Sequence, residues 1–401
     1  MSGNKKRPLV PLSRFPEFQD APEWSAEKLE ALITTVSPPS KLQSSSYLKK
    51  GKYPIIDQSQ DFICGWTDDD GAVIDNSLPL IIFGDHTCAL KFVNEPFAQG
   101  ADGIKILKAK SAISAEYLFH SLNHNPLMME DYKRHFSMLR ERVVAFPNIK
   151  SGEQQKIADC LSSLDELIVA ETQKLRALKT HKIGLMQQLF PREGEAVPQR
   201  RFPEFVGTAE WKEWSIGELG EVITGNTPST SKPQYYGGEF NFVSPADISD
   251  HRFVEKTKTS LTKLGFEQTR KIAEGSVLFV CIGSTIGKVA QNRFRCATNQ
   301  QINSLVPFAE FSGDFIYYLL LRESARIAEL AGNQAVPIIN KTTFSEFIVR
   351  CPQKGEQDRI AESLGALDKS ISIQAKKIDT LKTHKDGLMQ KLFPVFDEVS
   401  S

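Results

Sequence analysis

The chain has 401 residues with 49 basic and 49 acidic side chains, a length that predicts two or three domains and a composition that excludes a disordered or collagen-like protein. Its apolar stretch at residues 78–83 is far shorter than the roughly 20 residues that span a bilayer. The N-terminal sequence MSGNKKRPLV lacks the apolar segment of a secretory signal, so we expect a cytoplasmic protein.

The first large segment, residues 25–152, mixes strand-like and helical patterns. An apolar run at residues 80–83 predicts a buried strand, and residues 116–123 have helical periodicity. In the loop YLKKGKYP, Lys49, Lys50 and Lys52 could neutralise phosphates, and His86 in FGDHTCALKF could lie near a nucleic acid. A lone histidine is more often structural, and residues 1–152 hold 18 charges of each sign, so this segment has no basic excess.

A long helix is predicted at residues 153–191. Ten positions, separated alternately by four and three residues, form a heptad seam over about five heptads, which is typical of a coiled coil. The seam consists of Ile157, Leu161, Leu164, Ile168, Glu171, Leu175, Leu178, Lys182, Leu185 and Leu189. Pro191 ends the helix, because proline cannot continue its hydrogen bonds. A lone helix of this length would expose its apolar stripe, so it must pair.

The second large segment, residues 212–355, predicts strands at residues 221–224, 240–244 and 277–282 and a helix at residues 314–331. Its polar stretches are TGNTPSTSKPQYYGG (224–238), CIGSTIGKV (281–289) and TNQQIN (298–303), and from Arg252 to Arg295 nine basic residues stand against three acidic ones. Such residues suit phosphates and base edges, although an ordinary surface turn would explain any single one of them. The candidates for nucleic-acid contact are Tyr235, Tyr236, Lys256, Lys258, Lys263, Arg270, Lys271, Lys288, Arg293, Arg295, Asn299 and Gln300.

The chain also repeats itself. Residues 356–394 match residues 153–191 at 21 of 39 positions, and residues 201–211 match residues 14–24 at 7 of 11. The second seam consists of Ile360, Leu364, Leu367, Ile371, Gln374, Ile378, Leu381, Lys385, Leu388 and Leu392. Two copies related by a pseudo-twofold axis would lie antiparallel, and the polar seam positions would fix their register.

The large segments between these matched frames show no obvious similarity to each other. An old duplication followed by sequence divergence is one explanation. Divergence alone, however, should have affected the repeated segments as much as the large segments between them. We therefore predict two modules that do the same kind of work on two different targets.

The ends of the two long helices, GLMQQLF and GLMQKLF, carry an apolar cluster. It predicts either a local cap on the helix pair or a docking surface for another subunit. Its members are Met186, Phe190, Met389 and Phe393. Gly184 and Gly387 each cost their helix about 1 kcal/mol relative to alanine, and close approach of a neighbouring backbone would explain both.

No catalytic constellation is convincing. GSTIGK (283–288) is one residue short of the phosphate-binding pattern GxxxxGK[ST], no GxGxxG opens a helix, and GxSxG and HExxH are absent. An Asn/Asp-Pro-Pro-aromatic motif, as in amino-methyltransferases, is absent as well. The six cysteines include no CxxC pair and none at zinc-finger spacing from a histidine, so we expect no disulfide frame and no metal.

The duplicated helices, with EQxxIAxxL, LDxxI and KTHKxGLMQxLF, are similar to those of the specificity (S) subunit of type I restriction–modification systems. GNTPS with YYGG, GSTIGKVA with NQQIN, and FGDHT with GADGIKIL resemble segments of that family's target-recognition domains. The resemblance covers nearly the whole chain. It implies an α+β or α/β fold with two target-recognition domains, residues 1–152 and 192–355. Two long helices, residues 153–191 and 356–394, would separate them and pair as an antiparallel coiled coil, followed by a short tail at residues 395–401.

The resemblance also implies a division of labour. Each domain would read one half of a split, asymmetric target in double-stranded DNA, while the helices set the spacer and bind two methylating subunits. S-adenosylmethionine would be bound by those subunits, and ATP and magnesium by two restriction subunits, so this chain would hold no cofactor and catalyse nothing. Two rival hypotheses are a coiled-coil adaptor that never touches DNA and a cryptic hydrolase in one insert.

Overall fold

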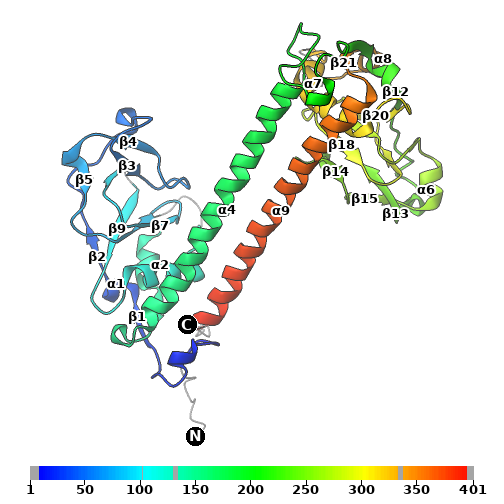
Figure 1. Cartoon of the computed structure of the whole chain (residues 1–401). Coiled ribbons are helices and arrows are strands. Elements are labelled where there is room, and N and C mark those ends of the chain that lie inside the picture. Colours follow the sequence, from blue (N-terminus) through cyan, green and yellow to red (C-terminus); the bar gives the residue numbers. More distant parts are fainter. Residues whose placement is uncertain (1–8, 102, 130–133, 333–336, 395–401) are drawn as a thin grey trace. The chain divides into compact units, whose positions relative to one another are not determined.

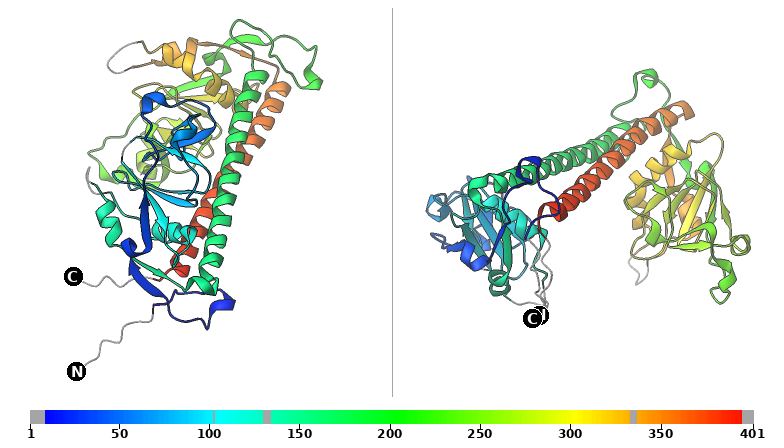
Figure 2. Two further views of the ribbon diagram at one scale, coloured as in Figure 1. Left: turned by 90° about the vertical axis from the view of Figure 1, so that its left-hand side faces the viewer. Right: turned by 90° about the horizontal axis from the view of Figure 1, so that it is seen from below.

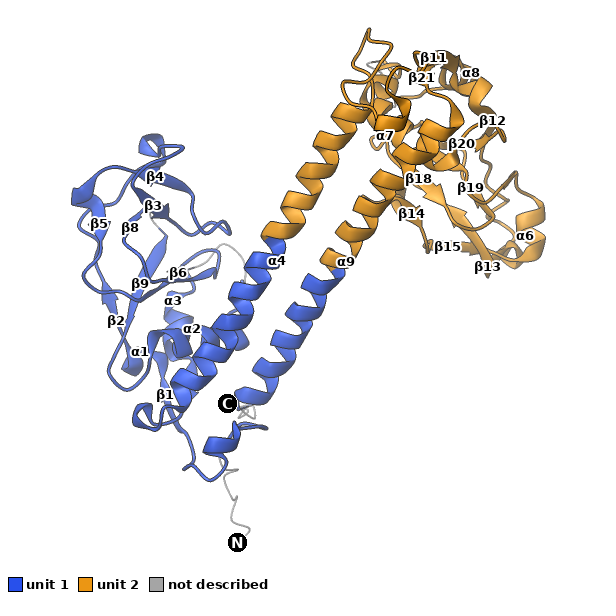
Figure 3. Ribbon diagram, viewed as in Figure 1, with its two compact units in different colours: residues 1–172, 376–401 blue, residues 173–375 orange. Residues whose placement is uncertain are grey.

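The two long repeated segments are helices that run from one structural unit of the chain into the other. The structure of the chain is a computed structural model that describes residues 9–101, 103–129, 134–332 and 337–394 (Figure 1). The first unit contains residues 1–172 and 376–401, and the second contains residues 173–375 (Figure 3). Each unit holds one mixed α/β domain and a half of each of two long helices, α4 and α9.

The two long helices are α4 (Glu153–Leu189) and α9 (Lys354–Leu392). Inside each unit the halves of α4 and α9 lie side by side, as the views in Figure 2 show. All twenty predicted seam positions are buried or half-buried. The exposed large apolar residues of these helices, Leu167, Val169, Ile183 and Ile373, all lie off the seam. The predicted pair of long helices is therefore confirmed, because an apolar stripe of this length is stable only when covered.

Among the residues that the structure describes, the first domain contains two four-stranded sheets, a two-stranded ribbon and three α-helices. One sheet has the order β2 (Ile33–Val36), β9 (Ile104–Ala109), β6 (Leu80–Gly84), β7 (Leu90–Val93). The other has the order β4 (Gly65–Thr67), β3 (Tyr53–Ile56), β8 (Phe97–Gln99), β5 (Val73–Ile74). The ribbon pairs β1 (Ser25–Lys28) with β10 (Val143–Phe146), and the helices are α1 (Leu29–Leu32), α2 (Ala115–His124) and α3 (Phe136–Glu141).

The second domain is built in the same way. One sheet has the order β12 (Gly220–Thr224), β20 (Ile302–Pro307), β17 (Val277–Val280), β18 (Val289–Asn292), β14 (Phe253–Val254). The other has the order β15 (Thr259–Leu261), β13 (Tyr236–Val243), β19 (Cys296–Thr298), β16 (Lys271–Ile272). The ribbon pairs β11 (Lys212–Ser215) with β21 (Ile348–Cys351), and the helices are α5 (Ile216–Leu219), α6 (Lys263–Glu267), α7 (Gly313–Glu329) and α8 (Lys341–Glu346).

The two domains therefore share one topology although their sequences show no obvious similarity. The sheet β2-β9-β6-β7 corresponds to β12-β20-β17-β18, to which the second domain adds β14 at the edge. The sheet β4-β3-β8-β5 corresponds to β15-β13-β19-β16. The strands and helices predicted from apolar runs and periodicity are all found, with ends shifted by a few residues. The repeated frame thus holds two copies of one domain fold with different surfaces.

The C-terminal end of each long helix packs into the core of the domain in the unit where that helix ends. Phe190, just past the end of α4, stacks on Phe315 at a centroid distance of 5.4 Å and packs edge-on to Trp211. Phe393, just past the end of α9, packs against Tyr117 at 5.6 Å. Each ring is nearly fully buried, which typically stabilises a fold by about 2–3 kcal/mol. The predicted apolar cluster is therefore divided between the two domain cores, Met186 and Phe190 in one and Met389 and Phe393 in the other, and does not form one cap on the helix pair.

The two helix glycines do not have the neighbour expected for them. A Cβ atom built on Gly184 or Gly387 would meet nothing within 4 Å, apart from its own helix. The expectation of a close backbone neighbour is thus wrong for the residues that the structure describes.

Candidate nucleic-acid interface and its helical frame

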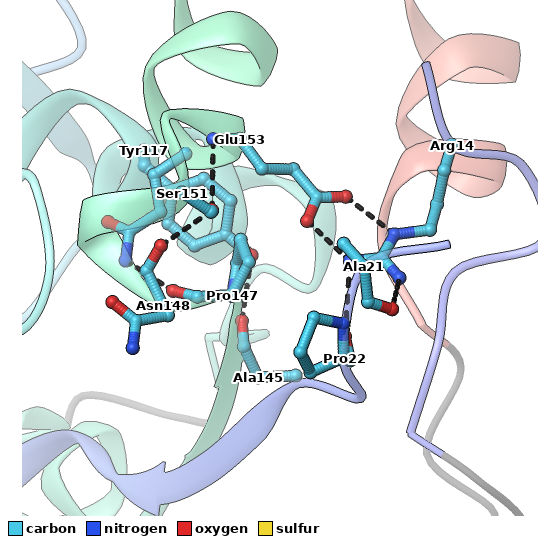
Figure 4. Close-up of polar contacts among 10 residues, drawn as sticks. Arg14, Ala21, Pro22, Tyr117, Ala145, Pro147, Asn148, Ser151 and Glu153 are labelled. Carbon is cyan, nitrogen blue, oxygen red and sulfur yellow. Dashed lines mark hydrogen bonds and ion pairs between the residues drawn. The ribbon is translucent and has the colours of Figure 1, made fainter. Parts of the chain in front are cut away.

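The short repeated motif RFPEF attaches each domain to the first turn of a long helix. The Arg14 guanidinium donates to the carboxylate of Glu153 at 2.8 and 2.5 Å, and also to the carbonyls of Ala21 and Pro22 (Figure 4). In the second unit, Arg201 binds Glu356 with the same two distances. Sequence reasoning did not single out these residues, although their identity in both copies was a signal available to it.

The glutamine that follows each of these glutamates connects the same helix end to the domain. The Gln154 side chain donates to the Pro147 carbonyl at 2.7 Å and accepts from the Ser114 amide at 2.8 Å, where α2 begins. Gln357 makes equivalent bonds to the Pro352 carbonyl and the Ser312 amide, where α7 begins. The paired EQ residues therefore fix the direction in which each long helix leaves its domain.

Reciprocal ion pairs set the register of the two helices. Lys385 Nζ donates to Asp165 at 2.6 Å in the first unit, and Lys182 Nζ donates to Asp368 at 2.6 Å in the second. The repeat offset of 203 residues converts one pair into the other, so the pairing is antiparallel and pseudo-twofold. Both lysines occupy the polar seam positions, which supports the prediction that these positions specify register.

The two aspartates have different neighbours in the two domains. Tyr318 donates to Asp368 at 2.6 Å, whereas the equivalent contact in the first unit is His120 Nδ1, 4.0 Å from Asp165. Burial, and then the charge of Lys385, lowers the pKa of His120 to about 4, so this imidazole is neutral at neutral pH. Burial and the hydrogen bond to Asp368 raise the pKa of Tyr318.

Reversing the charge of Lys385 tests the register pair. Lys385→Glu should lower the free energy of unfolding by about 1 kcal/mol, because the pair is only partly exposed and becomes repulsive. Adding Asp165→Lys should restore most of the loss. Urea denaturation of the single and double variants measures both effects. Lys382→Glu, at an exposed position off the seam, is the matched control, and an equal loss in it would contradict the assignment.

Three polar loops of the second domain meet at one place. Thr227 of GNTPS donates to Gln300 at 2.8 Å, and Gln301 donates to the carbonyl of Ile282 at 3.4 Å. A Cβ atom on Gly225 would lie only 2.2 Å from the carbonyl oxygen of Thr298, so this close approach requires glycine. The stretches GNTPS, CIGSTIGK and TNQQIN, which are distant in sequence, therefore form one polar surface.

The predicted basic residues of this domain are all exposed. Arg270 donates to the Thr224 carbonyl at 2.7 Å and Lys288 to the Ile248 carbonyl at 3.0 Å, so both help to shape loops. The side chains of four lysines make no hydrogen bond or ion pair with the residues that the structure describes, and they are thus free to meet phosphates. These are Lys256, Lys258, Lys263 and Lys271.

The two tyrosines serve the domain itself. Tyr235 is only 8% exposed, with Lys232 Nζ lying 5.3 Å from its ring centre, so the structure argues against its stacking on DNA. The hydroxyl of Tyr236 donates to the Pro228 carbonyl at 2.8 Å and holds the GNTPS loop. Asn299 likewise bonds to Gln301 within its own loop, which leaves Gln300 as the exposed amide of TNQQIN.

In the first domain the stretches FGDHT and GADGI meet around a polar cavity of about 440 Å³. The Asp85 amide donates to the Gly103 carbonyl at 2.7 Å, and the Thr87 hydroxyl donates to the Gln58 carbonyl at 2.6 Å. His86 lies in the wall of this cavity, as do three basic residues that sequence reasoning did not single out. These are Lys41, Lys105 and Arg134.

Only part of the lysine loop of the first domain is free to contact phosphates. Lys49 and Lys50 are exposed. Lys52 instead binds Asp70 at 2.6 Å, and this contact raises the pKa of Lys52. Lys49 and Lys50 therefore remain the phosphate candidates of this loop.

Within the described ranges, no group of three or more His, Cys, Asp or Glu side chains is placed to hold a metal ion. Nor does any described helix combine the length and apolar character needed to cross a membrane.

Comparisons with known proteins place these features in context. Residues 208–383 match the model of the type I restriction modification DNA specificity domain. The HindI specificity subunit of Haemophilus influenzae is 32% identical over 149 residues, which are 36% of this chain and 32% of that protein. The MjaIX specificity subunit of Methanocaldococcus jannaschii is 25% identical over 194 residues, 47% of this chain and 45% of that protein. The matches thus span a third to a half of the length of these relatives.

A solved structure has a similar fold over almost the whole chain. The type I restriction–modification S subunit from M. genitalium superposes with a TM-score of 0.69 at 16% identity, covering 97% of this chain and 100% of that one. At this identity the likeness is one of fold.

Proposed function

We propose that this chain is a specificity subunit of a type I restriction–modification system and works as a DNA-recognition scaffold. The match of residues 208–383 to the type I DNA specificity domain and the partial similarity to the HindI specificity subunit support this proposal. Each of its two domains reads one half of a bipartite, asymmetric target, and the paired helices set the distance between the halves. The observation that carries this proposal is that two domains of one topology present unlike polar loops on reciprocally paired helices.

The chemistry of the loops supports a DNA ligand. Exposed lysines and arginines supply phosphate contacts, and exposed amides such as Gln300 supply the donors and acceptors that read base edges. A zero net charge for the whole chain is compatible with DNA binding if partner subunits contribute part of the positive potential.

The partner subunits complete the proposal. Two methylating subunits dock on the helices and bring S-adenosylmethionine, and restriction subunits bring ATP and magnesium. A methylating enzyme must flip its adenine out of the duplex, so a separate scaffold that holds the duplex in register is useful. In this division of labour the chain itself catalyses no step and works in the cytoplasm.

Domain exchange tests the proposal directly. Residues 212–355 replaced by the matching segment of a related subunit should change one half of the methylated sequence and leave the other half as it was. Methylated adenines mapped in a genome that expresses the hybrid give the readout. If both halves change, the two domains are not independent readers and the modular model fails.

A DNA-binding assay distinguishes the proposed scaffold from the rival hypothesis, an adaptor that never touches DNA. Gel shifts at several salt concentrations, with partner subunits present, should show binding that weakens steeply as salt rises. An adaptor that never touches DNA would show no shift at any salt concentration.

A further inference from the structure

The turn between β18 and β19, residues 293–295, has the sequence Arg-Phe-Arg and carries an exposed aromatic ring. Phe294 is 63% exposed, more than any other described phenylalanine. Most of this ring therefore gains nothing from burial within its own domain. Its place in a short turn leaves the exposed face of the ring available to a binding partner.

The turn is held rigidly from below. Asn292, which is 2% exposed, donates from Nδ2 to the carbonyl of Phe294 at 2.9 Å and to that of Ala273 at 2.7 Å. A buried amide with two such bonds fixes the backbone of the turn. The ring of Phe294 is thus presented by an ordered support.

The two arginines of the turn lie over rings of their own domain. The Arg293 guanidinium is 4.1 Å from the ring centre of Phe253, and that of Arg295 is 5.8 Å from the ring centre of Phe266. These cation–π contacts keep both charges beside the turn, although both side chains are exposed. The turn therefore presents the Phe294 ring between two guanidinium groups whose positions are fixed.

The first domain supplies an internal comparison. Its equivalent turn, residues 94–96 between β7 and β8, also has three exposed residues, but their sequence is Asn-Glu-Pro. The buried position before that turn is Val93 instead of Asn292. Since the same topology forms with an acidic turn, the fold itself requires neither the ring nor the arginines.

We infer that Phe294 packs against the bases of the DNA duplex, as a wedge at a base step, while Arg293 and Arg295 meet the phosphates on either side. This inference rests on the proposed function and names a contact of the second domain that the first lacks. Apolar side chains that enter a base step in this way are a known means of gripping and bending a duplex. The local charge favours DNA as the occupant, because the segment from Arg252 to Arg295 has eight exposed basic residues and three acidic ones; its ninth basic residue, Arg252, is buried against Asp314.

Binding of the full chain, with its partner subunits present, to a mixed-sequence fluorescent duplex tests the inference. Phe294→Ala should weaken binding about tenfold, since stacking on an aromatic side chain contributes on that order per base. The dependence of affinity on salt should not change, because no charge is removed. The double variant Arg293→Gln with Arg295→Gln should instead reduce the slope of log affinity against log salt by about two.

Matched variants distinguish a specific contact of the Phe294 ring from a general loss of DNA affinity. Phe308→Ala removes a ring that is 47% exposed elsewhere in the same unit and should leave affinity unchanged. Phe294→Tyr should keep most of the affinity, because it keeps an aromatic face. If Phe294→Ala binds as well as the unaltered chain, or if Phe308→Ala loses as much, the wedge is refuted. Failure of the unaltered chain to bind any duplex in the presence of its partner subunits would instead refute the proposed function.

Discussion

Lengthening both long helices by one heptad should widen the gap between the two recognised half-sites by about three base pairs. Seven helical residues add about 10 Å at 1.5 Å per residue, and successive base pairs are about 3.4 Å apart. Each long helix begins in one unit and ends in the other, so the added length lies between the two domains.

The structure dictates where the insertions must be placed. Glu171 pairs with Lys377 on one side and Lys182 with Asp368 on the other, so new heptads after Ala177 and after Ser372 keep both pairs intact. The inserted residues should repeat the seam pattern. Methylation mapping, or sequencing of bound DNA from a random pool, gives the new spacing.

A heptad in α4 alone provides the control. It would put the helices out of register on one side of the insertion, and the protein should lose stability instead of gaining a longer gap. A doubly lengthened chain that still recognises the original spacing would show that the helices do not act as a ruler.

The second large effect is expected at the buried arginine–glutamate pairs. Replacing Arg201 by methionine should lower the free energy of unfolding of the second unit by about 3–5 kcal/mol, because it leaves a buried charge without a partner. The side chains of Arg201 and Glu356 are only 7% and 1% exposed. Urea denaturation measures the loss, and amide hydrogen exchange shows which unit opens.

Two controls define this effect. Arg350→Met removes an exposed pair with Glu213, whose side chains are 29% and 60% exposed, and should cost less than about 1 kcal/mol. Adding Glu356→Leu to Arg201→Met should recover much of the stability, since no unpaired charge then remains. Equal losses from Arg201→Met and Arg350→Met would mean that the pair does not anchor the helix.

The two long helices and their pairing could be predicted from the sequence, because the patterns that define them are local and occur twice. Alternating spacings of four and three residues from Ile157 to Leu189 define one apolar stripe, and an apolar stripe of that length must be covered. The repeat at an offset of 203 residues then identified the second long helix as the partner of the first. A pseudo-twofold axis between the two copies implied that they pair antiparallel. The reciprocal Lys182–Asp368 and Asp165–Lys385 pairs obey the same offset.

The candidate site was less predictable. The sequence indicated polar loops and a basic segment, but not that Tyr235 is buried or that Lys52 is bound to Asp70. Nor did it indicate the cavity around His86. Exposure of a side chain depends on which distant segments cover it, and that information is absent from a short window of sequence.

By itself, the sequence determined the two long helices, their pairing and the duplication of the frame, because helical periodicity is written within a few turns of one segment. Only the tertiary structure decided that the unlike inserts share one topology, and that Arg14 meets Glu153 across 139 residues of chain. Contacts between residues so far apart are set by how whole elements pack, and many different sequences satisfy the same packing.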